Sequence, residues 1–183
     1  MELKIKKDMG FGKFLKNMGG FTATELLLVT TLLSSIPVSN YVGARNKALQ
    51  AKCLSNLRQI GMAVELFVQS EGTYPNAKFY SESPLKDPSS IVWILEPYGL
   101  KGDVFICPAS PPILAEKGLT YLWNDELSGK NPAQVRSPQN VWMVVGVTAL
   151  DERVSSHSGG YNILYADGHV DWSSQPPPIS RKK

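Results

Sequence analysis

The segment from Asn17 to Leu28 constrains this chain more than any other part of it. A lysine-rich stretch ends in Gly19-Gly20, and Phe21 then opens an apolar run. The run contains one charged residue, Glu25, which is the fifth residue counted from Phe21. A carboxylate inside an apolar segment of membrane length costs about 2.5 kcal/mol or more and is usually kept for a function.

The arrangement of Gly20, Phe21, Glu25 and the following leucines resembles the processing site of type IV prepilins and of type II secretion pseudopilins. In that family a prepilin peptidase cuts after the glycine and methylates the new terminal phenylalanine. The glutamate neutralises the terminal amine of a neighbouring subunit.

The resemblance implies processing at Gly20 and Phe21 and an assembly role for Glu25. The implied partners are the peptidase, like subunits and an inner-membrane assembly platform. The match is weaker at Ala23-Thr24, where the family usually has Leu-Ile or Leu-Val.

An ordinary secretory signal peptide is the simpler alternative, because it also has a basic start and an apolar core. Its small-x-small cleavage site should follow that core closely, yet the first tolerable one is Val42-Gly43-Ala44. A plain single-pass anchor is the other alternative, and it gives no reason for Glu25. The prepilin interpretation accounts for both features.

The net charge of +3 lies in the first 20 residues, which hold five lysines against Glu2 and Asp8. Such a leader favours a cytoplasmic N-terminus. The segment Phe21–Val42 is long enough, at about 22 residues, to cross a bilayer core of about 30 Å. We therefore expect a single-pass inner-membrane protein in contact with membrane lipid, with its C-terminal domain periplasmic or in an extracellular filament. The remaining charges balance, so no nucleic-acid partner is expected.

The expected fold is α+β and pilin-like, with one long N-terminal helix packed on a small antiparallel β-sheet. Helical periodicity resumes after Pro37, where apolar residues recur every three or four positions at Leu49, Cys53, Leu57, Ile60, Val64 and Phe67. A continuous helix over 21–71 would be about 75 Å long. Its first half would lie in lipid and its amphipathic second half against the domain. Thr and Ser hydroxyls in the first half can bond to carbonyls of the preceding turn.

The predicted organisation is a leader over 1–20, a transmembrane and assembly helix over 21–43, an α+β domain over 44–172 and a disordered tail over 173–183. Within the domain we expect a short helix over 90–98, preceded by Asp87 as N-cap and Pro88 at the first helical position. Strands are expected over 120–124 and 141–148, the second buried on both sides because its apolar run does not alternate.

The motif Asp167-Gly168 between two β-rich runs predicts a hairpin with a two-residue type I′ turn. Tyr165 would then oppose Val170. His157 lies ten positions before Asp167 and completes a His-x9-Asp-Gly pattern, which resembles the C-terminal signature of the same family. Two motifs of one family at opposite ends of the chain support the assignment together.

Cys53 and Cys107 are the two cysteines of the chain, and both follow the apolar segment. Disulfides persist in exported compartments, so a bond between them is chemically allowed. Two separate buried thiols are the alternative, and the sequence leaves both open.

The candidate ion ligands in the sequence are His157, Asp167, His169 and Asp171. The sequence favours a plainer interpretation, in which Asp167 is a turn residue and His157 pins a loop by hydrogen bonds. No metal or other cofactor is therefore expected. No catalytic residues are assigned either, because no nucleophile-and-base motif, phosphate loop or zinc-protease motif occurs.

These observations predict a non-enzymatic structural subunit of a type II secretion pseudopilus or type IV pilus-like filament, processed after Gly20. The alternative is a membrane-tethered extracytoplasmic binding module that does not polymerise. The two differ in whether Glu25 is needed.

Overall fold

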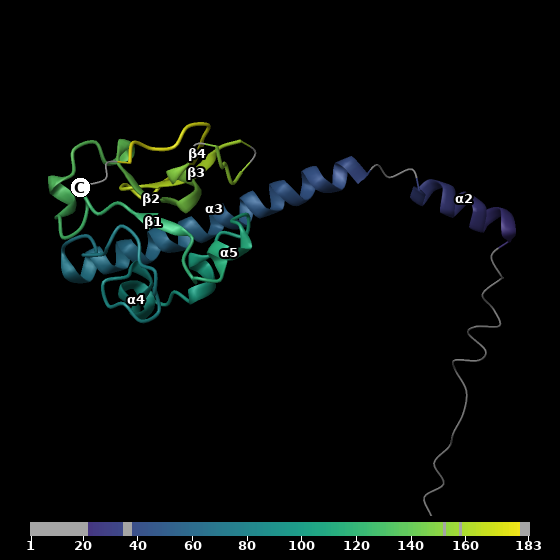
Figure 1. The fold of residues 1–183 in the computed structure, drawn as a ribbon. Coiled ribbons are helices and arrows are strands. Elements are labelled where there is room, and N and C mark those ends of the chain that lie inside the picture. The colour runs from purple at the N-terminus through teal and green to yellow at the C-terminus, as the bar shows by residue number, and fades with distance from the viewer. Residues whose placement is uncertain (1–21, 35–37, 152, 158, 180–183) are drawn as a thin grey trace, which may run out of the picture. The chain divides into compact units, whose positions relative to one another are not determined.

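The computed structural model describes residues 22–34, 38–151, 153–157 and 159–179 (Figure 1). The chain divides into two compact units, Met1–Val42 and Gly43–Lys183, each considered by itself. The predicted leader, its processing residues Gly20 and Phe21, and Pro37 lie outside the described residues.

Helix α2 covers Ala23–Ser34 and contains the apolar run that follows the glycine pair. Its threonines are compatible with helix because the hydroxyls of Thr30 and Thr31 donate to carbonyls of the preceding turn, at 2.9 Å to those of Leu26 and Leu27. The expected back-bonding of hydroxyl groups is thus confirmed at these two positions.

Helix α3 covers Val38–Glu71 and ends at Gly72, whose φ of 75° is the left-handed conformation common just beyond a helix. Its apolar stripe is the predicted one: Cys53, Leu57, Ile60 and Val64 are all at most 2% exposed. The period of three and four residues therefore predicted the buried face of α3 correctly.

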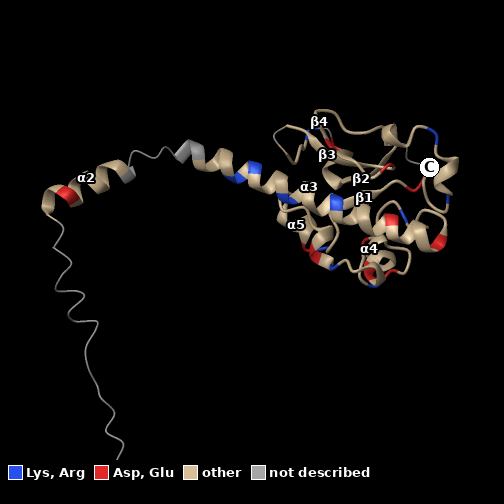
Figure 2. Cartoon of the chain, turned by 180° about the vertical axis from the view of Figure 1, so that it is seen from behind, with Lys and Arg blue, Asp and Glu red and all other residues tan. Residues whose placement is uncertain are grey.

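The expected fold class, with one long pilin-like helix that includes a membrane half, is wrong. The described part of the apolar run lies in α2, Ala23–Ser34, and the amphipathic stripe lies in α3, Val38–Glu71. At about 1.5 Å per residue, α2 spans about 18 Å, short of the about 30 Å of a bilayer core. Helix α3 is longer but carries charged residues along its length, such as Arg45, Lys52 and Glu65 (Figure 2).

The expected localisation as a single-pass inner-membrane protein is also wrong. Across residues 22–34, 38–151, 153–157 and 159–179, no helix combines the length and the apolar character needed to cross a membrane.

The Gly43–Lys183 unit holds a four-stranded antiparallel sheet in the order β1-β2-β3-β4, so the architecture is α+β. The strands are β1 Tyr121–Trp123, β2 Trp142–Gly146, β3 Tyr161–Tyr165 and β4 Val170–Ser173. The strands expected over 120–124 and 141–148 are confirmed as β1 and β2.

Short helices connect these elements. They are α4 Ile91–Leu95, η1 Glu96–Tyr98, η2 Gly102–Phe105, α5 Pro112–Ala115, η3 Pro132–Gln134, η4 Pro138–Asn140 and η5 Val147–Leu150. The helix expected over 90–98 is present as α4 and η1, but its N-cap is Ser90, whose Oγ accepts from the Val92 N–H. Asp87 instead accepts hydrogen bonds from Ser89 and Ser81.

Strands β1, β2 and β3 are buried on both faces of the sheet, which explains the uninterrupted apolar run of β2. One face packs with α3 and α4 in the larger core, where Tyr121 and Trp123 are each 1% exposed. The other face carries a second cluster that includes Leu122, Trp142 and Val145. Part of the segment expected as a tail contacts this cluster, because the Trp142 indole donates to the Pro178 carbonyl at 3.2 Å.

The β3–β4 hairpin forms as expected, but its predicted register is wrong by one residue. Leu164, not Tyr165, pairs with Val170. The turn is a three-residue loop, in which the Gly168 N–H donates to the Tyr165 carbonyl and Gly168 has a φ of 88°. Asp167 does not share the positive φ that a type I′ turn requires. The extra loop residue shifts every side chain of β4 to the opposite face relative to β3.

Candidate functional site

Glu25 lies in the first turn of α2, where it forms a capping box with Thr22. The Thr22 Oγ1 accepts from the Glu25 N–H at 3.3 Å, while the Glu25 carboxylate accepts from the Thr22 N–H at 2.9 Å. This reciprocal pair satisfies two backbone donors that the start of a helix otherwise leaves unpaired. Sequence analysis missed this role, although Thr22-x-x-Glu25 is the known signature of such a cap.

The carboxylate of Glu25 is exposed, and its hydrogen bonds within the described chain are local. Donation from the Thr22 backbone, and then from its hydroxyl, lowers the pKa of Glu25 below its usual value. The apolar residues that follow are exposed as well: Leu26, Leu27 and Leu28 are 59%, 65% and 62% exposed. Helix α2 thus carries one negative charge in its first turn, followed by exposed leucines and no further charged residue (Figure 2).

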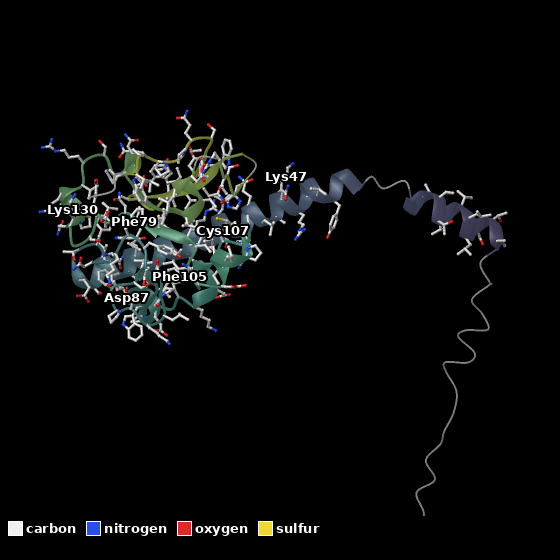
Figure 3. All side chains as sticks on the ribbon, in the orientation of Figure 1. Lys47, Phe79, Asp87, Phe105, Cys107 and Lys130 are labelled. Carbon is white, nitrogen blue, oxygen red and sulfur yellow. The ribbon has the colours of Figure 1, made fainter. Side chains whose placement is uncertain are left out.

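Cys53, Cys107 and His157 meet in the interior of the Gly43–Lys183 unit. Their ligand-type atoms all lie within 4.8 Å of one another, and the Cys107 Sγ lies 3.2 Å from the His157 Nε2. The three come from α3, from the segment after η2 and from the loop before β3, and each is at most 4% exposed. Both cysteines are free thiols in the structure, with Cys107 labelled in Figure 3.

The two thiols differ in pKa. The hydrogen bond from Cys53, together with His157, lowers the pKa of Cys107 to about 4. The same pairing and burial raise the pKa of Cys53 above its usual range. Cys53 also lies 3.3 Å from the Tyr121 hydroxyl, whose own pKa is raised by burial. The pKa of Cys107 therefore lies below that of Cys53.

The hairpin signature does not form one site. The Asp167 carboxylate and the His169 Nδ1 are hydrogen-bonded at 2.6 Å on the surface of the hairpin, and the His169 ring stacks on Tyr165. They line a groove of ≈ 660 Å³ between α3 and the hairpin turn, whereas His157 lines the small cavity beside Cys53 and Cys107. The histidine of the pattern is thus separated from its Asp-Gly and placed with the cysteines.

The spacing within the pattern has a structural reason. His157 and Gly160 exchange backbone hydrogen bonds, and the Trp172 indole donates to the His157 carbonyl at 3.0 Å. A Cβ on Gly160 would come within 2.6 Å of the Trp172 ring. Because Gly160 has no side chain, the Trp172 indole can pack against this loop and hold His157 in position.

The grouping of His157 with the cysteines had no signal in the sequence, because Cys107 and His157 are 50 residues apart and belong to no common motif. Comparison with protein families, with curated proteins and with solved structures found no match.

Proposed function

We propose that this chain is a structural subunit of a filament of the type II secretion pseudopilus or type IV pilus-like class. In this proposal a prepilin-type peptidase cleaves after Gly20, and like subunits associate through α2. The chain's role is assembly and not catalysis.

The observation that carries the proposal is the surface of α2. Leu26, Leu27, Leu28 and Leu32 are each more than half exposed, so the helix buries little of its apolar area within its own chain. Each such side chain gains about 1.5–3 kcal/mol when it is fully buried. Packing the helix against copies of itself would recover that free energy.

Glu25 supplies the specificity in this arrangement. Cleavage after Gly20 would leave an ammonium group on Phe21, and Glu25 is the one charged residue of the segment 21–34. Burying either charge alone is costly, whereas pairing them between neighbouring subunits compensates both. The carboxylate is exposed and thus accessible to such a partner.

The capping box gives Glu25 a second role, which a glutamine substitution separates from the first. Glutamine retains the cap but removes the charge. We expect Glu25→Gln to abolish filament assembly as completely as Glu25→Ala, with leader cleavage intact in both. Thr22→Ala is the matched control, because it removes the capping hydroxyl and keeps the carboxylate, and it should still assemble.

The measurements use cells that express the full chain together with a prepilin peptidase. Mass spectrometry of the extracted protein should show an N-terminus at Phe21, and electron microscopy of sheared filaments should show polymers for the unmodified chain and for Thr22→Ala. Normal filaments from Glu25→Gln would refute the charge-pairing role. An uncut leader in every variant would refute the proposed function itself and favour the non-polymerising binding module.

A further inference from the structure

We propose that Cys53, Cys107 and His157 bind a zinc ion that ties α3 to the two loops packed on it. This site is independent of the proposed assembly function, because none of its residues belongs to α2.

The three ligand atoms lie close to the distances that a zinc ion requires. In a tetrahedral zinc site, Zn–S bonds of about 2.3 Å and Zn–N bonds of about 2.0–2.1 Å place the ligand atoms about 3.5–3.8 Å apart. All three ligand atoms lie within 4.8 Å of one another, so small side-chain rotations would complete the geometry. Two thiolates and an imidazole are a donor set that zinc prefers.

The ligands are held by the surrounding fold. The Cys107 N–H donates to the Thr120 hydroxyl at 2.6 Å, which fixes the loop after η2 to the segment before β1. His157 is held by its two backbone bonds with Gly160 and by the Trp172 indole. Ligands positioned before the metal arrives lose little entropy when they bind it.

The charge balance also fits a buried site. A zinc ion with two thiolates and a neutral imidazole sums to zero, so the complex does not bring a net charge into the core. The other residues that line the cavity are uncharged: Gly146, Thr148, Ser156, Tyr161 and Asn162.

Two residues that line the cavity carry a buried polar atom that could bind a water molecule beside the ion. The His157 Nδ1 and the Asn162 Oδ1 are buried and find no hydrogen-bond partner among the residues that the structure describes, and both residues line this cavity. Buried polar groups without partners are rare and often indicate a water or an ion. The cavity of ≈ 10 Å³ has room for about one water molecule, which is enough for the fourth ligand of a zinc site.

The test uses the full chain, purified under reducing conditions, loaded with Zn²⁺ and desalted before its metal content is measured. We expect one zinc per chain in the unmodified protein and less than about a tenth of that in Cys107→Ser and His157→Gln, since three ligands are the minimum of such sites. His169→Gln is the matched control, because His169 lies on the exposed hairpin, and it should retain the zinc.

X-ray absorption at the zinc edge makes the test independent of whether the variants fold. The unmodified chain should show two sulfur neighbours at about 2.3 Å and lighter ligands at about 2.0–2.1 Å. A reduced chain that retains no zinc, or zinc retained equally by His157→Gln and His169→Gln, would overturn the proposal.

Discussion

Gly168 shows how one residue sets the register of the last hairpin. It adopts a φ of 88° as the third residue of the loop, and a Cβ there would meet no atom within 4 Å. Its requirement for glycine is therefore conformational and not a matter of space. Asp167 supports the same turn, since its carboxylate accepts from the His169 N–H at 3.1 Å.

Substitutions at Gly168 should rank by their tolerance of positive φ. We expect Gly168→Val to destabilise the chain by about 1–2 kcal/mol or more, the cost of the left-handed conformation for a residue with a Cβ. Gly168→Asn should cost less, because asparagine visits this region readily. Urea denaturation of the two variants gives the comparison, and equal stability of Val, Asn and the unmodified chain would contradict the observed loop.

One face of helix α3 packs into the hydrophobic core, and the opposite face is exposed to solvent. Leu57 is fully buried in the larger cluster, whereas Leu66, on the same helix, is 50% exposed. Cys53 lies one turn before Leu57, so the buried stripe of α3 continues directly into the cysteine and histidine cluster.

Leu57→Ala should lower the free energy of unfolding by about 2–5 kcal/mol, because it removes buried methyl groups and leaves a cavity. Leu66→Ala is the matched substitution on the same helix and should stay within about 0.5 kcal/mol of the unmodified chain. Denaturant melts of both variants measure the difference. Similar losses for the two would mean that the helix does not pack through the stripe described.

At the scale of the whole molecule, the chain consists of two units with different stabilising interactions. Both apolar clusters are built from residues of the Gly43–Lys183 unit. Helix α2 belongs to the other unit and exposes most of its apolar side chains. Neither apolar cluster of the larger unit, as described, contains a residue of α2.

A fragment that begins at Gly43 should consequently fold on its own. We expect a cooperative thermal transition with a Tm within about 4 °C of that of the full chain, a shift that corresponds to about 1 kcal/mol or less for a domain of this size. Circular dichroism of the fragment and of the full chain measures both transitions. A fragment without a cooperative transition would show that the first 42 residues contribute to the core.

The sequence by itself determined the features that rest on local periodicity and local turn chemistry. The apolar stripe of α3, strands β1 and β2 and the existence of the hairpin were all predicted, because the spacing of apolar residues reflects which face is buried. The cap of α2 was equally readable from Thr22-x-x-Glu25, although the prediction did not use it.

Only the tertiary structure decided the rest. The hairpin register depended on one loop residue, and both loop lengths are compatible with Asp-Gly. No helix among the described residues is long and apolar enough to cross a membrane, and this overturned the long helix and the membrane location expected from the apolar run. The cluster of Cys53, Cys107 and His157 joins positions up to 104 residues apart. Such contacts arise when whole elements pack, and no local pattern encodes them.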